Sequence, residues 1–140
     1  MQKGNPATRR RKTVLTKKQI NHFRDLLENK RRALLGSVQS LESDALRGSG
    51  DSSTHKPFHP DDQSSEAYNQ DFKLQLAASE RQLLEEIDLA LQRIEEGRFG
   101  ICEATNKPIQ LSRLEAKPWA HMCIEAARER DRRNALYPQT

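Results

Sequence analysis

Residues Phe99–Ala127 read FGICEATNKPIQLSRLEAKPWAHMCIEAA and hold both cysteines of the 140-residue chain, Cys102 and Cys123. The spacing Cys102-x2-Thr105, then 17 residues, then Cys123-x2-Ala126 follows the frame of two zinc knuckles, with one cysteine missing from each. A structural zinc ion needs four thiolate or imidazole ligands in a closed tetrahedron. Threonine is a poor ligand and alanine is none, so this frame predicts a degenerate zinc finger.

We expect this segment to hold no zinc, or at most a weak metal site at Cys102 and Cys123. His121, two positions before Cys123, is the nearest candidate for a third ligand, which would still leave the site open. Without a metal, the two cysteines act as small buried hydrophobic residues. Apolar side chains then have to form the core of the module, and we expect this core to include Trp119, Ile109 and Leu114.

Two long apolar stripes precede the cysteine segment. The first follows a capping-box pattern, Thr16 with Gln19, and recurs at helical spacing before Gly48 and Gly50. The second stops at Gly97. The stripes comprise Ile20, Phe23, Leu27, Leu34, Val38, Leu41 and Ala45, and then Leu76, Leu83, Ile87, Leu91 and Ile94, with Ala77, Leu84 and Ala90 supporting the second stripe.

The charges of the two predicted helices are opposite in sign. Residues 1–47 carry 12 Lys and Arg against 4 Asp and Glu, whereas residues 48–101 carry 5 against 11. Two helices that each have one narrow apolar face need a partner, and opposite flanking charges attract. We therefore predict an antiparallel coiled-coil hairpin, with an intermolecular coiled coil as the alternative.

The fold class predicted from these patterns is all-α dominated, in three parts. Residues 1–15 are polar and basic and are expected to form a disordered arm. Residues 16–97 form the hairpin, with a tip loop near residues 48–65. Residues 98–140 form the degenerate zinc-finger module with a C-terminal helix that starts near Cys123. With 34% hydrophobic residues and no apolar run long enough for a membrane span or a secretory signal, the chain reads as cytoplasmic.

The cysteine segment resembles the C-terminal module of the DksA/TraR family. The matching residues are Phe99-Gly100, Cys102-Glu103, Pro108-Ile109, Arg113-Leu114-Glu115-Ala116, Pro118 and Cys123-Ile124. The order of elements over about residues 16–136 is also similar. The chain departs from the common pattern at Thr105 and Ala126, as do cysteine-poor members that keep the fold without zinc.

The resemblance implies a regulator that binds bacterial RNA polymerase and inserts its coiled coil into the secondary channel to modulate transcription initiation, as in the stress response. The family's tip motif is Asp-x-x-Asp-x-Ala, and the segment HPDDQSSEAY fits it imperfectly. One register uses Asp61 and Ser64 with Glu66 at the alanine, and the other uses His59 and Asp62 with Ser64 at the alanine. An ordinary solvated turn is the alternative. The tip residues expected to act at the polymerase are Asp61, Asp62 and Ser64.

The resemblance also bears on cofactors and partners. Basic positions that some members use for the alarmone ppGpp correspond to Glu86, Lys117 and Ala127, so we expect little or no ppGpp response and no cofactor. We expect a monomer with no membrane contact and no sequence-specific DNA binding. A basic nucleic-acid-associated coiled-coil protein and a plain coiled-coil scaffold are the alternatives. An enzyme is not expected, because no Ser or Cys has a base at a recognisable spacing.

Overall fold

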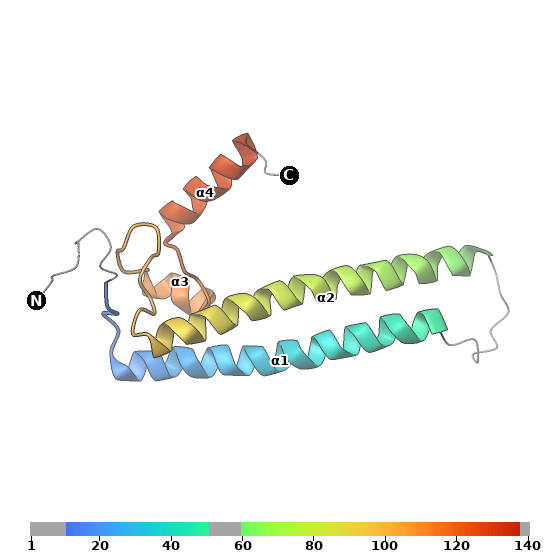
Figure 1. Cartoon of the computed structure of the whole chain (residues 1–140), viewed down its shortest axis with the longest axis horizontal. Coiled ribbons are helices and arrows are strands. Elements are labelled where there is room, and N and C mark those ends of the chain that lie inside the picture. The colour runs from blue at the N-terminus through green and yellow to red at the C-terminus, as the bar shows by residue number, and fades with distance from the viewer. Residues whose placement is uncertain (1–10, 51–59, 138–140) are drawn as a thin grey trace, which may run out of the picture. The chain divides into compact units, whose positions relative to one another are not determined.

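The computed structural model describes residues 11–50 and 60–137, and it describes side chains over residues 11–47 and 65–137. In these ranges the protein consists of helices α1 (Lys17–Gly50), α2 (Pro60–Glu95), α3 (Leu111–Ala116) and α4 (Ile124–Leu136), shown in Figure 1. The β pairing found there is an isolated antiparallel bridge between Ile101 and Pro108. The all-α prediction is confirmed. None of the helices in the described ranges is both long and apolar enough to span a membrane.

Helix α1 begins at the capping box that the sequence predicts. The Gln19 backbone N–H donates to Thr16 Oγ1 at 3.2 Å, and the Thr16 backbone N–H donates to Gln19 Oε1 at 2.9 Å. These two bonds satisfy backbone donors that would otherwise lack a partner at the helix start. The sequence signal and the observed helix start therefore agree.

Helix α2 begins at a proline and ends at a glycine. Pro60 is its first residue, a position that needs no backbone N–H. At the other end Gly97 has φ +72°, and its N–H donates to the Ile94 carbonyl at 3.1 Å. The Arg98 N–H donates to the Arg93 carbonyl at 2.9 Å, which completes a Schellman motif. The left-handed conformation at Gly97 turns the chain out of the helix and into the module.

The chain divides into two compact units, which we call the base unit and the hairpin unit. The base unit contains residues 11–28 and 86–137. Its core includes Phe23 and Phe99, whose ring centroids are 5.6 Å apart. The other buried apolar side chains of this unit are Leu27, Ile87, Ala90, Ile94, Ile101, Cys102, Ile109, Leu114, Ala120 and Ala127.

The hairpin unit contains residues 29–50 of α1 and 60–85 of α2, running in opposite directions (Figure 1). Leu34, Val38, Ala45 and Ala77 are its buried apolar side chains among the described residues. Gln70 Nε2 donates to the Ala45 carbonyl at 3.1 Å, and Arg81 pairs with Glu42. In this pair the cation comes from α2 and the carboxylate from α1, which is the reverse of the polarity predicted from the net charges of the two helices.

Residues 11–15 do not match the predicted disordered arm of residues 1–15. The Thr13 N–H donates to the Gly97 carbonyl at 2.8 Å, so this segment is held against the base unit. Leu15 packs on Gly100, where φ is +83° and an added Cβ would lie 3.0 Å from Leu15 Cδ1. The backbone of residues 11–15 finds partners that composition alone does not reveal. Residues 1–10 lie outside the described residues.

Two further expectations for the hairpin differ from the structure. The predicted tip loop at residues 48–65 is shorter, because α1 continues to Gly50 and α2 starts at Pro60. Leu76, predicted in the buried stripe, is exposed, whereas Ala77, a supporting member of the same stripe, is buried as expected. Between residues 68 and 76 the large apolar side chains of α2 are therefore exposed.

Candidate functional site

The first knuckle is a tight backbone turn around Cys102. The Asn106 N–H donates to the Cys102 carbonyl and the Cys102 N–H donates to the Lys107 carbonyl, both at 2.8 Å. Asn106 has φ +60°, a left-handed conformation that asparagine tolerates better than most residues. Inside the turn the Thr105 N–H points at Cys102 Sγ at 3.4 Å. The backbone thus keeps the shape of a zinc knuckle.

The Cys102 thiol lies in an environment that favours its ionised form. Burial by itself raises the pKa of a thiol, but here hydrogen bonds from the Thr105 hydroxyl and from nearby backbone N–H groups outweigh burial and lower the pKa of Cys102 to about 7. The Thr105 hydroxyl also lies 4.0 Å from Cys123 Sγ. Thr105 therefore occupies the place of a knuckle cysteine and contacts both thiols of the module.

The donor set at the four knuckle positions does not fit a structural zinc ion. Cys102 and Cys123 are both free thiols, whereas Thr105 offers a hydroxyl and Ala126 a methyl group. His121 Nδ1 lies 3.5 Å from Glu103 Oε2, which makes the Glu103 carboxylate its nearest charged partner. Within residues 11–50 and 60–137, no group of three or more His, Cys, Asp or Glu side chains is placed to hold a metal ion.

Arg93 joins the end of α2 to the module and was not singled out from the sequence. Its side chain is 5% exposed, and Nη2 donates to the Trp119 carbonyl at 3.3 Å. Nη1 lies 3.9 Å from Glu103 Oε1. Burial lowers the pKa of Arg93, and the Glu103 charge opposes that shift. The sequence gives only a weak signal that Arg93 is buried and bonded to the module. The signal is its position between Leu91 and Ile94, two apolar residues of the second stripe.

His121 lies on the other side of Glu103. Burial lowers the pKa of His121, with the Arg93 and Arg130 charges acting in the same direction and the Glu103 carboxylate opposing them. We therefore expect a neutral imidazole at neutral pH. His121 and Glu103 are also linked through the backbone, where the Glu103 N–H donates to the His121 carbonyl at 2.9 Å.

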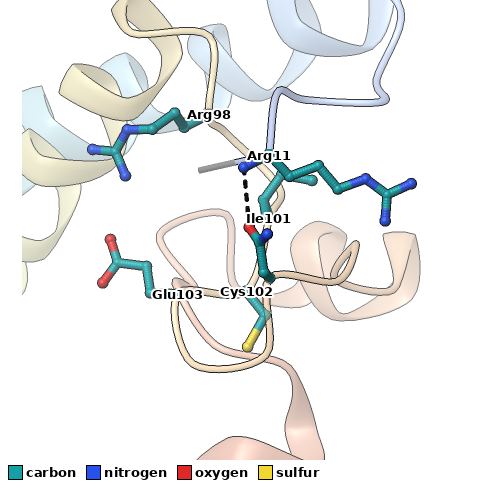
Figure 2. A pocket seen from close by; sticks show the side chains of 6 residues that line it. Arg11, Arg98, Ile101, Cys102 and Glu103 are labelled. Atoms are coloured by element: carbon teal, nitrogen blue, oxygen red, sulfur yellow. Dashed lines mark hydrogen bonds between the residues drawn. The ribbon is translucent and has the colours of Figure 1, made fainter. Parts of the chain in front are cut away.

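The N-terminal segment closes one side of the first knuckle. The Arg11 backbone N–H donates to Asn106 Oδ1 at 3.0 Å. Figure 2 shows the pocket at this contact, with Arg11 coming from the N-terminal segment and Cys102 from the knuckle. Its other lining residues are Arg98, Ile101, Glu103 and Asn106. Sequence reasoning missed this contact, since neither Arg11 nor Asn106 belongs to an apolar pattern.

The predicted module core is partly as expected. Ile109 and Leu114 are buried, whereas Trp119 is only half-buried. The largest buried side chain of the module is instead Phe99, which packs on Phe23 of α1. Phe99 directly follows the Schellman turn at the end of α2. Phe99, the aromatic residue of the module that follows α2 most closely in sequence, is therefore the main aromatic core residue, and the larger Trp119 is not.

The predicted tip residues fall at the start of α2. Asp61, Asp62 and Ser64 belong to its first two turns, but their side chains lie outside the described residues. Acidic residues in the first turn of a helix interact favourably with the positive end of the helix dipole. His59, used by the second motif register, also lies outside the described residues.

Known proteins that are similar to this chain share both its module and its helical arrangement. The family model described as the prokaryotic dksA/traR C4-type zinc finger matches residues 97–132. The RNA polymerase-binding transcription factor DksA of Caulobacter vibrioides is 40% identical over 76 residues, which are 54% of each chain. The chain thus spans about half the length of this curated relative.

Two further relatives are matched over more of their length. DksA of Escherichia coli K12 is 31% identical over 109 residues, which cover 76% of this chain and 68% of that protein. The solved structure of transcription factor DksA2 from Pseudomonas aeruginosa superposes with a TM-score of 0.72 at 30% identity, over 87% of this chain and 90% of that one.

Proposed function

Because this chain belongs to the DksA/TraR family, we propose that it is a transcription regulator that binds bacterial RNA polymerase and catalyses no reaction itself. The observation that carries the proposal is the shared architecture, in which a helical hairpin leads into the knuckle module. The relatives from Caulobacter and E. coli are named as polymerase-binding factors. The proposed partner is therefore RNA polymerase in the cytoplasm, and the proposed working form is a monomer.

We further propose that the hairpin enters the secondary channel of the polymerase with the start of α2 leading. The sequence places Asp61 and Asp62 at that end, next to the first residue of α2. Carboxylates suit a cation-rich, magnesium-containing centre, because Mg²⁺ prefers oxygen ligands and unlike charges attract strongly at short range. Binding by the helices and action by the tip are thus separable functions.

The direct test is transcription from a promoter whose open complex is short-lived. We expect Asp61→Asn with Asp62→Asn to bind core polymerase within about tenfold of wild type, roughly 1.4 kcal/mol. We also expect the double variant to lose most of the effect on transcript yield, since only charge is removed. Asp71→Asn, at an exposed acidic residue of the same helix, is the matched control and should behave as wild type.

Two restored variants identify the motif register in the same assay. Ser64→Asp with Glu66→Ala completes the first register, and His59→Asp with Ser64→Ala completes the second. The variant that restores the working register should strengthen the effect. Equal activity of wild-type, neutralised and restored proteins would contradict a role for the tip carboxylates, and failure of the wild type to capture core polymerase would contradict the function itself.

We propose that regulation does not depend on ppGpp. Of the three positions that the resemblance points to, Glu86 is exposed and acidic, and Ala127 is buried and has no charge to offer. Lys117 is exposed and is the single cation of the set. A ligand with several phosphates needs more than one cationic partner. Adding ppGpp to the transcription assay should leave the effect of the protein unchanged, and a strong enhancement would contradict this proposal.

A further inference from the structure

The two cysteines of the module contact the same hydroxyl group. The Thr105 hydroxyl donates a hydrogen bond to Cys102 Sγ and lies 4.0 Å from Cys123 Sγ. Cys102 is fully buried, Cys123 is half-buried, and both are free thiols. Figure 2 shows the Cys102 sulfur pointing away from Arg11, on the side of the knuckle opposite the N-terminal segment. An ion that takes the place of the Thr105 hydroxyl can therefore contact both sulfurs.

The number of available ligands decides which metal ions suit this place. A structural zinc ion needs four thiolate or imidazole ligands, and neither Thr105 nor Ala126 supplies one. In the described part of the chain no third His, Cys, Asp or Glu side chain completes a metal-binding group with the two cysteines. Cu(I) is instead a soft monovalent cation that thiolates select, and two of them complete its coordination. A pair of thiols without further ligands therefore fits Cu(I) and not Zn²⁺.

The surroundings of the two sulfurs stabilise the charge of such a complex, because one Cu(I) ion with two thiolates is an anion. Cys102 Sγ accepts the Thr105 N–H at 3.4 Å and further hydrogen bonds from the backbone N–H groups of Ala104 and Cys123. Cys123 is also the N-cap residue of α4, so the positive end of the helix dipole lies at the second cysteine. Hydrogen-bond donors and the helix dipole thus act in the same direction.

An open cavity gives a metal ion access to this place. Its volume is about 610 Å³, and its lining includes Ala104, Thr105, Met122 and Ala126 together with side chains along α4. Thr105 and Ala126 are the two knuckle positions without a cysteine. Because Thr105 also contacts both thiols, an ion that enters this cavity has one side chain between itself and the two sulfurs.

We propose that Cys102 and Cys123 form a two-coordinate site for Cu(I). Each thiol loses its proton when the ion binds, because the thiolate is the ligand. The bound ion joins the two knuckles through sulfur, which is the structural role of zinc in a complete finger, but it does so with two ligands instead of four. The site is separate from the proposed binding of RNA polymerase and does not depend on it.

The test is an anaerobic titration of the reduced full-length protein with Cu(I), in competition with a coloured Cu(I) chelator. We expect one copper per monomer and a new ultraviolet absorbance from sulfur-to-copper charge transfer. The melting midpoint should also rise, since a ligand that binds the folded state stabilises it. Cys102→Ser and Cys123→Ser should each weaken binding at least about 100-fold, because loss of even an outer-shell partner costs about 10–100-fold in metal affinity.

Cys123→Ser with Ala135→Cys is the matched control. It keeps two thiols but moves one to an exposed position of α4, about 18 Å further along the helix at about 1.5 Å per residue. This variant should bind Cu(I) as weakly as Cys123→Ser alone, and equal affinity of the control and wild type would overturn the site. Copper that binds only between two chains, seen as a dimer in sedimentation, would overturn it too. Copper uptake that leaves the melting midpoint unchanged would show that the ion does not join the knuckles, which also contradicts the proposal.

Discussion

At the scale of single residues, Thr105 shows how a residue that is a poor zinc ligand can stand at a knuckle position and still contact both thiols of the module. Its N–H and hydroxyl both contact Cys102, while its hydroxyl lies near Cys123. A zinc ion would stabilise thiolates at these positions by charge. Here hydrogen bonds stabilise the thiolate form of Cys102. The pKa of Cys102 therefore depends on whether these hydrogen bonds of the turn are formed.

Thr105→Val should raise the pKa of Cys102 from about 7 toward its ordinary 9, because the hydroxyl donor is lost while the side-chain volume is kept. The measurement is a pH titration of ultraviolet thiolate absorbance in a Cys123→Ser background, which isolates Cys102. Thr105→Ser keeps a hydroxyl and should titrate close to the parent protein. Identical titrations for the valine and serine variants would show that the hydroxyl does not stabilise the thiolate.

His121 makes stability depend on pH. Because burial lowers its pKa below the ordinary 6.5, the unfolded chain takes up the proton more readily than the folded chain. The stability contribution of neutral His121 is complete above about pH 6.5 and is lost as pH falls below that value. Wild type should therefore lose more unfolding free energy than His121→Gln between about pH 7.5 and pH 5.5. Equal losses in denaturant titrations of the two proteins would contradict this assignment.

At the scale of elements, the start of α1 and the end of α2 were predicted well, whereas the helix ends at the tip and the chain before α1 were predicted less well. Thr16 with Gln19, and Gly97, mark their helix ends through local hydrogen bonds that depend on a few adjacent residues. The contact between Arg11 and Asn106 joins positions 95 residues apart. No local pattern encodes such a contact, so the sequence suggested an unattached arm where the structure has an attached segment.

The knuckle module is expected to fold without zinc. Protein purified without added metal should contain well under one zinc per chain, because two of the four knuckle positions offer no thiolate. A chelator should leave the helical circular dichroism and the melting midpoint unchanged, whereas a zinc-dependent module unfolds on metal removal. Elemental analysis after dialysis is the measurement. Thr105→Cys with Ala126→Cys, which completes the frame, should gain stoichiometric zinc and chelator sensitivity.

At the scale of the whole molecule, hydrophobic periodicity predicted the hairpin because most of each stripe does face the other helix. Phe23, Leu27, Ile87 and Ile94 are all buried as expected. Periodicity failed at Leu76, which is exposed, although Ala77, counted with the same stripe, is buried. Periodicity also could not predict that Phe99 is more deeply buried than Trp119. The burial of each aromatic side chain depends on the direction that the chain takes after the end of α2.

Phe99→Ala should destabilise the base unit more than any other single truncation in the module. Its ring is fully buried and packs on Phe23, so we expect a loss of about 3–5 kcal/mol in unfolding free energy. Trp119→Ala removes a half-buried side chain and should cost clearly less. Chemical denaturation of both variants tests the ranking, and the opposite order would show that Trp119 is the main anchor after all.

The division of the chain between the two units sets an order for folding during synthesis. The hairpin unit is drawn from the continuous stretch between residues 29 and 85, so a ribosome completes it early. The base unit combines residues 11–28 with residues from 86 onward. The hydrogen bond from the Thr13 N–H to the Gly97 carbonyl can therefore form only after Gly97 has been synthesised. Phe23 and Leu27 thus remain uncovered until most of the chain has been translated, since such distant contacts close late. A chain truncated after α2 would leave Phe23 without Phe99, the module residue that packs on it.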